Sequence, residues 1–147
     1  MRRLILSLAF LAHLVACGAE EDAAPPPTTS VNELMMTVIT PATNTLWAAE
    51  DPSTDAEWQA LADAAALVID ATASIRLGGS GPNDMQWSAD PAWQAFADDL
   101  DQAANDAYAA ASKRDLDALF LANDVLYPPC EECHVQFHPG VSEDGAD

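Results

Sequence analysis

The sequence predicts an all-α fold, an antiparallel bundle of four helices. Three observations predict it. Apolar side chains recur at helical spacing in four separate runs. Each run begins at a residue that caps helix N-termini, and short connections separate the runs. The composition agrees, because a chain of 147 residues with six glycines and half of its residues hydrophobic is unlike an all-β protein and can bury the core of one domain.

The first sixteen residues have the pattern of an export signal. A short basic start precedes an apolar run over residues 4–16, which is too short to span a bilayer as a mature helix. The run ends in the tetrapeptide LVAC, which resembles the lipobox of bacterial lipoproteins, in which the cysteine is acylated and becomes the new N-terminus. We therefore expect residues 1–16 to be a lipoprotein signal peptide and Cys17 to carry lipid. An ordinary signal peptide with an incidental cysteine is the alternative.

Residues 17–30 are predicted to be a lipidated, flexible tether. Three consecutive prolines favour extended polyproline geometry. Acyl chains on Cys17 would hold the protein on the periplasmic side of a bacterial membrane without spanning it. The next residue is Gly18 and not Asp, which by analogy with lipoprotein sorting favours the outer membrane.

The first helix is predicted from Val31 to about residue 50. Ser30 is a favourable N-cap, and Glu33 stands at the position that completes a capping box. Pro41 lies inside the helix and predicts a kink, because it lacks an N–H donor and crowds the preceding turn. The residues expected to face inward are Val31, Leu34, Met35, Val38, Ala42, Thr45 and Leu46.

The second helix is predicted over residues 55–77. Thr54 and Glu57 repeat the capping-box pattern at its start, and two glycines at 78–79 end it. Residues 78–89 then form a loop, as their Gly, Pro, Asn and Ser content indicates. The residues of this helix expected to face inward are Trp58, Leu61, Ala65, Val68, Thr72 and Ile75.

The third helix is predicted from the Asp90-Pro91 pair to about Ser112, since Asp caps a helix and Pro is favoured at its first position. Its inward residues are expected to be Trp93, Phe96, Leu100, Ala103, Ala107 and Ala111.

Asp115 is the predicted cap of a fourth helix. The two prolines at 128–129 lack N–H donors and interrupt its hydrogen-bond ladder, so a fresh helical turn can start there. The folded domain is expected over residues 31–139, followed by an acidic tail at 140–147. The inward residues are expected to be Leu116, Leu119, Phe120, Asn123 and Tyr127.

The motif that carries chemistry is C-x-x-C-H at Cys130, Cys133 and His134. It is the attachment signature for a c-type haem. Two thiols at i and i+3 share a helical face and can each form a thioether with a haem vinyl group, and the adjacent imidazole then binds the iron as proximal ligand. With Cys17 taking lipid, no cysteine remains for a disulfide or for thiol catalysis.

Two other interpretations of the motif remain open. A thioredoxin-like redox pair would use the two thiols, but the βαβ context of that fold is missing. A non-haem metal-binding lipoprotein would instead use Cys130, Cys133, His134 and His138 as a tetrahedral site.

A C-terminal CxxCH on the last of four amphipathic helices, with a methionine near the start of the first, resembles the class II c-type cytochromes, the cytochrome c-prime family. The resemblance covers residues 31–139. It implies a left-handed four-helix bundle holding one covalent haem c. Some members of the family are five-coordinate and bind small gases, whereas others place a first-helix methionine on the iron and carry electrons. The chain departs from the family at its paired prolines and in lacking Lys or Arg soon after His134.

The distal iron ligand is predicted to be Met35. His138 lies one turn from His134 on the same side of the iron, and Met85 would need its loop to fold over the pocket. Met36 points about 100° away from Met35 around the helix. The alternative for Met35 is core packing, which would leave an open distal pocket for a gas.

Arg76, at the end of the second helix, is a candidate partner for the haem propionates. Lys113 and Arg114 are expected instead to complement a helix dipole.

The predicted function is that of a membrane-tethered electron carrier and not of an enzyme. The formal charge is −19, and loss of the signal peptide removes two arginines and makes it more negative by two units. This charge excludes a nucleic-acid binder and predicts a redox partner with a basic surface patch. A five-coordinate gas-binding protein is the alternative within the family, and a homodimer is compatible with the resemblance.

Overall fold

The computed structural model describes residues 27–138. In that range the helices are α1 (Val31–Leu34), the π-helical turn η1 (Met35–Ile39), α2 (Thr40–Trp47), α3 (Asp55–Arg76), α4 (Asp84–Trp87), α5 (Pro91–Lys113) and α6 (Leu116–Phe137). No strand occurs between residues 27 and 138, so the predicted all-α fold class is confirmed there. The predicted signal peptide, Cys17 and the acidic tail lie outside the described residues.

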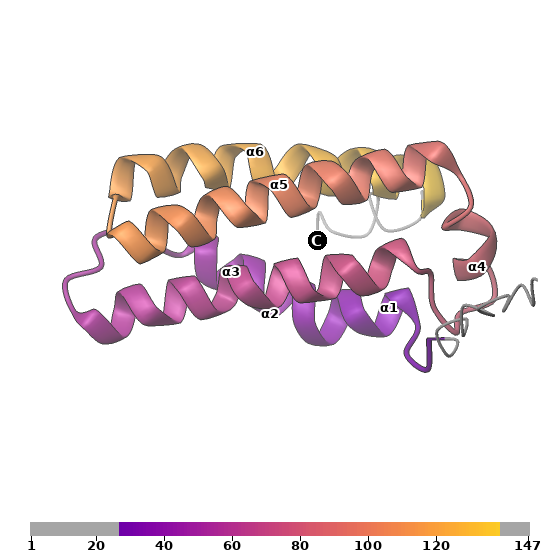
Figure 1. The fold of residues 1–147 in the computed structure, drawn as a ribbon, viewed down its shortest axis with the longest axis horizontal. Coiled ribbons are helices and arrows are strands. Elements are labelled where there is room, and N and C mark those ends of the chain that lie inside the picture. Colours follow the sequence, from indigo (N-terminus) through magenta and orange to yellow (C-terminus); the bar gives the residue numbers. More distant parts are fainter. Residues whose placement is uncertain (1–26, 139–147) are drawn as a thin grey trace, which may run out of the picture.

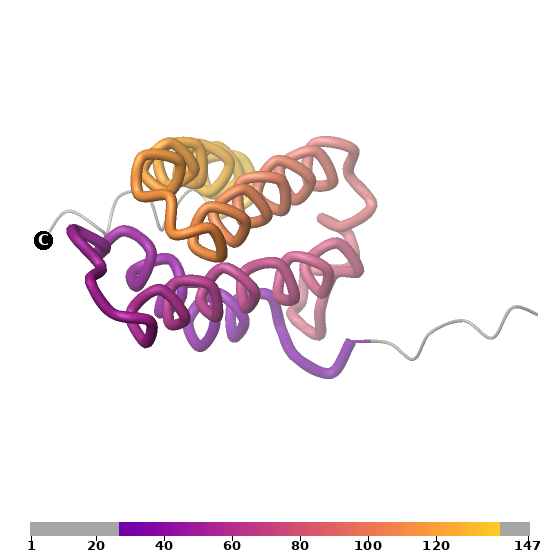
Figure 2. The backbone as a smooth tube through the Cα atoms, turned by 60° about the vertical axis from the view of Figure 1, so that its left-hand side comes forward, coloured from indigo at the N-terminus to yellow at the C-terminus, as the bar shows by residue number. Residues whose placement is uncertain are grey.

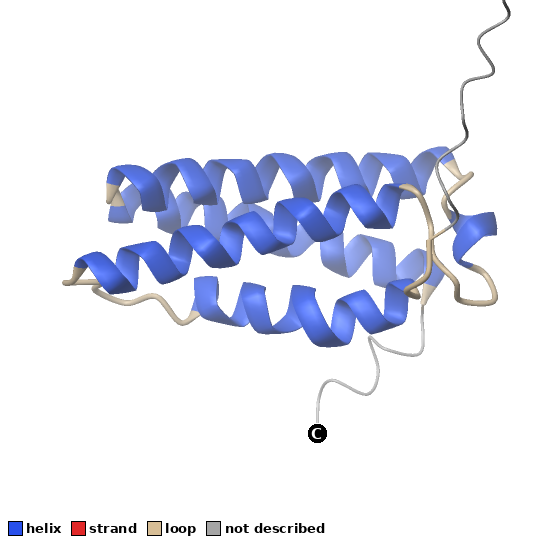
Figure 3. Cartoon of the chain, turned by 60° about the horizontal axis from the view of Figure 1, so that its bottom comes forward, coloured by secondary structure: helices blue, strands red, loops and turns tan. Residues whose placement is uncertain are grey.

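The long helices lie side by side along the long axis of the molecule (Figure 1). α5 packs against both α3 and α6, whereas α2 packs mainly against α3. The segments α1, η1 and α2 follow one another directly along one edge. Loops join the longer helices, and the short α4 lies within the connection from α3 to α5 (Figure 3). Within residues 27–138, none of the helices combines the length and the apolarity that a membrane crossing needs.

Small side chains allow α5 to sit close to both of its neighbours. α5 buries six alanines, while α3 and α6 contribute larger aliphatic groups such as Val68, Leu119 and Leu126, all fully buried. Because alanine adds little bulk between helix backbones, α5 can pack against both α3 and α6 (Figure 2). The buried alanines of α5 are Ala97, Ala103, Ala104, Ala107, Ala110 and Ala111.

The predicted helix starts are confirmed at every cap. The hydroxyl of Thr54 accepts a hydrogen bond from the backbone of Glu57 at 3.2 Å, and the Glu57 carboxylate accepts one from the Thr54 backbone at 2.8 Å. Asp90 and Asp115 cap α5 and α6 with their side chains alone, which accept from the backbone N–H groups of Ala92 and Ala118. Ser30 caps α1, although no bond from its backbone to Glu33 completes the predicted box in the described structure.

The predicted kink at Pro41 takes the form of the π-helical turn just before it. In that turn the backbone N–H of Thr40 donates to the carbonyl of Met35, five residues back. The wider turn relieves the crowding that a proline ring imposes on the carbonyl four residues earlier. The extra residue also shifts the helical phase, so Ile39 is buried and the predicted inward residue Thr45 is exposed.

The expected fresh turn at the paired prolines is wrong, because α6 runs unbroken from Leu116 to Phe137. Pro128 and Pro129 remove the donors for the carbonyls of Asp124 and Val125, and both of these residues are exposed, where water can replace the missing N–H groups.

Two aromatic residues of α6 that were expected to face inward are exposed instead. Phe120 is 42% exposed and Tyr127 is 54% exposed, while Ala122 and Leu126 take the buried positions. The reason is that α6 faces α5 rather than the centre of four equivalent helices, which rotates its buried stripe.

Candidate functional site

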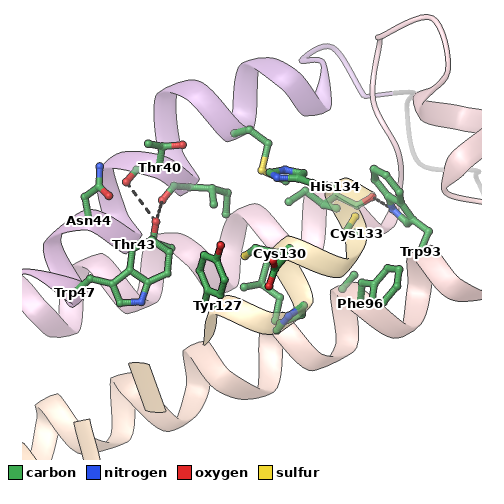
Figure 4. A pocket seen from close by; sticks show the side chains of 17 residues that line it. Thr40, Thr43, Asn44, Trp47, Trp93, Phe96, Tyr127, Cys130, Cys133 and His134 are labelled. Atoms are coloured by element: carbon green, nitrogen blue, oxygen red, sulfur yellow. Dashed lines mark hydrogen bonds between the residues drawn. The ribbon is translucent and has the colours of Figure 1, made fainter. Parts of the chain in front are cut away.

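A cavity of about 390 Å³ lies between the first helical segments and α6, against α5 (Figure 4). α6 contributes Cys130, Cys133 and His134 to its lining. η1 contributes Met35 from the other side. The structure thus brings together the four residues that were predicted to attach and ligate a haem, and a pocket of this size is within the range of about 300–1,000 Å³ typical of small-molecule sites.

The cavity exists because α2 and α6 are joined by hydrogen bonds at one position only. The side-chain amide of Asn123 in α6 donates to the carbonyl of Leu46 at 2.8 Å. The indole of Trp47 donates back to the carbonyl of Asn123 at 3.4 Å. Beyond this tie, α1–α2 rests on α3 and α6 rests on α5, so the side chains between them line a space instead of packing together.

The three motif residues share one face of α6, since positions i, i+3 and i+4 lie on the same side of a helix (Figure 4). All three are half-buried, and both cysteines are free thiols. The thiol of Cys130 donates to the carbonyl of Leu126 at 3.5 Å, one turn back along α6. The uninterrupted helix therefore presents two thiols and an imidazole to the same cavity.

Burial keeps the motif side chains neutral. It raises the pKa of Cys130 to about 11. The pKa of Cys133 is also raised to about 11, first by burial and then by the neighbouring Cys130. A thioredoxin-like pair needs a thiol whose pKa is depressed, so this arrangement does not favour thiol redox chemistry. Burial, and secondarily His138, lowers the pKa of His134, which keeps a ring nitrogen available as a ligand.

Met35 reaches the cavity, and the other candidate distal ligands do not. Met36 is 66% exposed and Met85 is 59% exposed, and neither lines the cavity. His138 is exposed and likewise outside the lining. Among residues 27–138, Met35 is accordingly the thioether that shares a space with the C-x-x-C-H motif.

Arg76 is engaged elsewhere. Its guanidinium lies 2.8 Å from the carboxylate of Asp98 and 3.6 Å from that of Asp101, and it also donates to the carbonyl of Ala97 at 3.3 Å. These contacts join α3 to α5 beside the cavity, whose lining does not include Arg76. Its role toward haem propionates stays a prediction.

An aromatic cluster lies behind Trp93, one of the residues that line the cavity, and the sequence alone did not predict how its rings combine. Trp93 is buried, lines the cavity and donates its indole N–H to the carbonyl of Ile75 at 3.0 Å. Its ring stacks on Trp87 at 5.8 Å and meets Phe137 edge-on at 5.2 Å. Phe137 comes from α6 one turn after His134, so no pattern within a single helix could have indicated this cluster.

The residues present fit a covalent haem. Two free thiols and an imidazole face a thioether across an apolar, aromatic-walled space, and the hydroxyl of Thr43 turns back to the carbonyl of Ile39 in its own helix (Figure 4). By contrast, nowhere in residues 27–138 do three or more His, Cys, Asp or Glu side chains gather in an arrangement that could hold a metal ion, which gives no support to the tetrahedral site with His138.

Comparison with protein-family models, curated proteins and solved structures gives no match for this chain, so its function is inferred from the site itself.

Proposed function

We propose that this protein is a monohaem c-type cytochrome that carries electrons. The observation that carries the proposal is the shared cavity: Cys130, Cys133 and His134 from α6 line it together with Met35 from η1. No other set of residues in the described chain combines an attachment motif with a distal thioether and an enclosing apolar wall.

Each side chain has a distinct part in this proposal. Cys130 and Cys133 would hold the haem through thioethers, and His134 and Met35 would bind its iron. When bound, the haem supplies a one-electron iron couple, whose reduction potential a Met/His ligand pair raises. Trp93 and Phe96 exclude water from the site, and a low-polarity surrounding adds to this control of the potential.

The wider architecture belongs to the same proposal. The segments α1, η1 and α2 count as the first helix of an antiparallel four-helix bundle, with α3, α5 and α6 as the others. Lipid on Cys17 and the tether at 17–30 hold the bundle on the periplasmic side of the outer membrane. The protein acts as a carrier, without catalysis of its own, between membrane-associated partners.

The first experiment is an absorption spectrum of the full chain expressed with a c-type haem maturation system. Spectra are recorded oxidised, reduced, and reduced with carbon monoxide, and again after denaturation. We expect haem that stays with the denatured chain and a low-spin spectrum indifferent to the gas. Loss of all haem on denaturation contradicts the proposal. A high-spin spectrum that shifts on addition of carbon monoxide would indicate a gas-binding protein and not an electron carrier.

A further inference from the structure

A second, more open groove of about 570 Å³ adjoins the cavity, between α2 and α6. It is lined by Trp47, Phe120, Asn123, Asp124 and Tyr127. Two of these residues, Trp47 and Tyr127, also line the cavity, and their rings meet edge-on with centroids 6.1 Å apart. A molecule that docks in the groove therefore touches the wall of the proposed cofactor site.

The groove exposes an aromatic surface that the fold leaves uncovered. Trp47, Phe120 and Tyr127 are 41%, 42% and 54% exposed, although each could bury a large apolar area. Exposed aromatic groups that cluster beside polar ones are typical of interaction surfaces.

The described lining of the groove contains an acidic side chain and no Lys or Arg. The carboxylate of Asp124 is exposed at its edge. The side-chain oxygen of Asn123 is buried and has no hydrogen-bond donor among residues 27–138, while its amide nitrogen is used on Leu46. Aromatic faces also attract cations. The exposed carboxylate of Asp124 and the faces of the exposed aromatic rings therefore favour a positively charged group in the groove.

We propose that this groove is the docking surface for a basic redox partner, an inference that rests on the proposed electron-carrier function. A Lys or Arg of the partner lies over the rings of Trp47 and Tyr127 and pairs with Asp124. Charge selects this partner over a second copy of the chain, because the net charge of −19 repels a copy and attracts a basic protein. The two described arginines, Arg76 and Arg114, are already paired with carboxylates of their own chain.

The test uses ¹⁵N-labelled, haem-loaded protein titrated with a small basic c-type cytochrome at low salt, both proteins reduced. Amide shifts are expected to change around the groove. Asp124→Asn should raise the Kd about fivefold, the upper range for an exposed ion pair. Phe120→Ala should raise it about tenfold, as loss of an aromatic contact does. Neither residue lines the cavity, so the haem spectrum is expected to stay unchanged.

Two matched controls isolate the groove. Asp70→Asn removes the same charge from an exposed position on α3, and Leu121→Ala removes an exposed apolar group next to Phe120 but outside the groove. Both should leave the Kd within about twofold. Asp70→Asn removes only a distant, screened charge, and Leu121→Ala removes no contact in the groove.

Three results would overturn the docking surface. Shifts could map to another face, Asp124→Asn could behave as Asp70→Asn does, or the groove could prove to join two copies, which sedimentation would show as a dimer that Phe120→Ala dissociates. Failure of the proposed function is distinct from all of these, because it appears as the absence of covalent haem before any partner is added.

Discussion

Position 35 is where one side chain would distinguish the two functions proposed for the cavity. Met35 comes from the π-helical turn and lines the space that faces His134, whereas its neighbour Met36 points to solvent. A thioether on the iron closes the sixth position to gases, and its removal opens that position.

Met35→Ala is expected to convert the reduced haem from low-spin to high-spin, to allow carbon monoxide to bind and to lower the reduction potential. Met36→Ala is the matched control and should change none of these, because that side chain is 66% exposed and outside the cavity. Absorption spectra and a redox titration measure the outcome. A variant at position 35 that stays low-spin would show that Met35 is core packing and not a ligand.

At the scale of elements, the loop before α5 is clasped to the start of the first helix by Asp84. The buried carboxylate of Asp84 accepts hydrogen bonds at 2.8 Å from the backbone N–H groups of Val31 and Gly81. A side chain at Gly81 would meet this carboxylate at 2.6 Å, which explains the glycine there. The clasp holds α1 one turn before Met35, so it also positions the proposed distal ligand.

Asp84→Ala is expected to destabilise the protein by about 1–3 kcal/mol, because it leaves two backbone donors without a partner. Chemical denaturation measures the loss, and hydrogen exchange should quicken at Val31. Asp70→Ala, at an exposed position on α3, is the control and should stay within about 0.5 kcal/mol of the parent. Equal effects of the two substitutions would mean that the clasp adds no stability.

The start of α3 gives a pH-dependent prediction. Backbone hydrogen bonds from Ser53 and Thr54 lower the pKa of Glu57 below its usual 4.5. A depressed carboxyl pKa contributes stability that is present above pH 4.5 and is lost as the pH falls through the folded-state value. The difference in unfolding free energy between the parent and Glu57→Gln should therefore be full at pH 7 and shrink in acid.

Glu33→Gln is the matched control for that prediction. Glu33 occupies the same position after the cap of α1, but its carboxylate receives no hydrogen bond in the described part of the chain. Its substitution should cost less stability at pH 7. If the two differences have the same size and pH dependence, the capping box at Thr54 is not their cause.

At the scale of the whole molecule, the net charge would act together with the proposed lipid anchor. The chain carries five basic residues against 24 acidic ones, so its long-range field is negative. Such a field speeds encounter with basic proteins and is screened by salt. A carrier on a lipid tether would combine this steering with confinement near its membrane partners.

The electron-exchange rate with a basic c-type cytochrome is expected to fall about tenfold between roughly 50 and 500 mM salt, because salt screens the attraction. Stopped-flow kinetics measure it. Exchange with an acidic redox protein is the control and should quicken over the same range. If the exchange rate is independent of salt with both partners, net charge does not contribute to recognition.

Local patterns were sufficient for much of the fold. The caps at Thr54, Asp90 and Asp115 start their helices where predicted, since each cap depends on the backbone next to it. The shared face of Cys130, Cys133 and His134 follows from helical spacing in the same way. The methionine predicted to face the motif also reaches the cavity.

Only the tertiary structure decided the features that join distant segments. Asp84 accepts a hydrogen bond from the start of a helix 53 residues away, Asn123 ties α6 to α2, and Phe137 packs against Trp93 of another helix. The continuous course of α6 through two prolines and the exposure of Phe120 and Tyr127 were missed for the same reason. Helical periodicity reports which residues share a face, but which neighbour covers that face depends on packing across the whole chain.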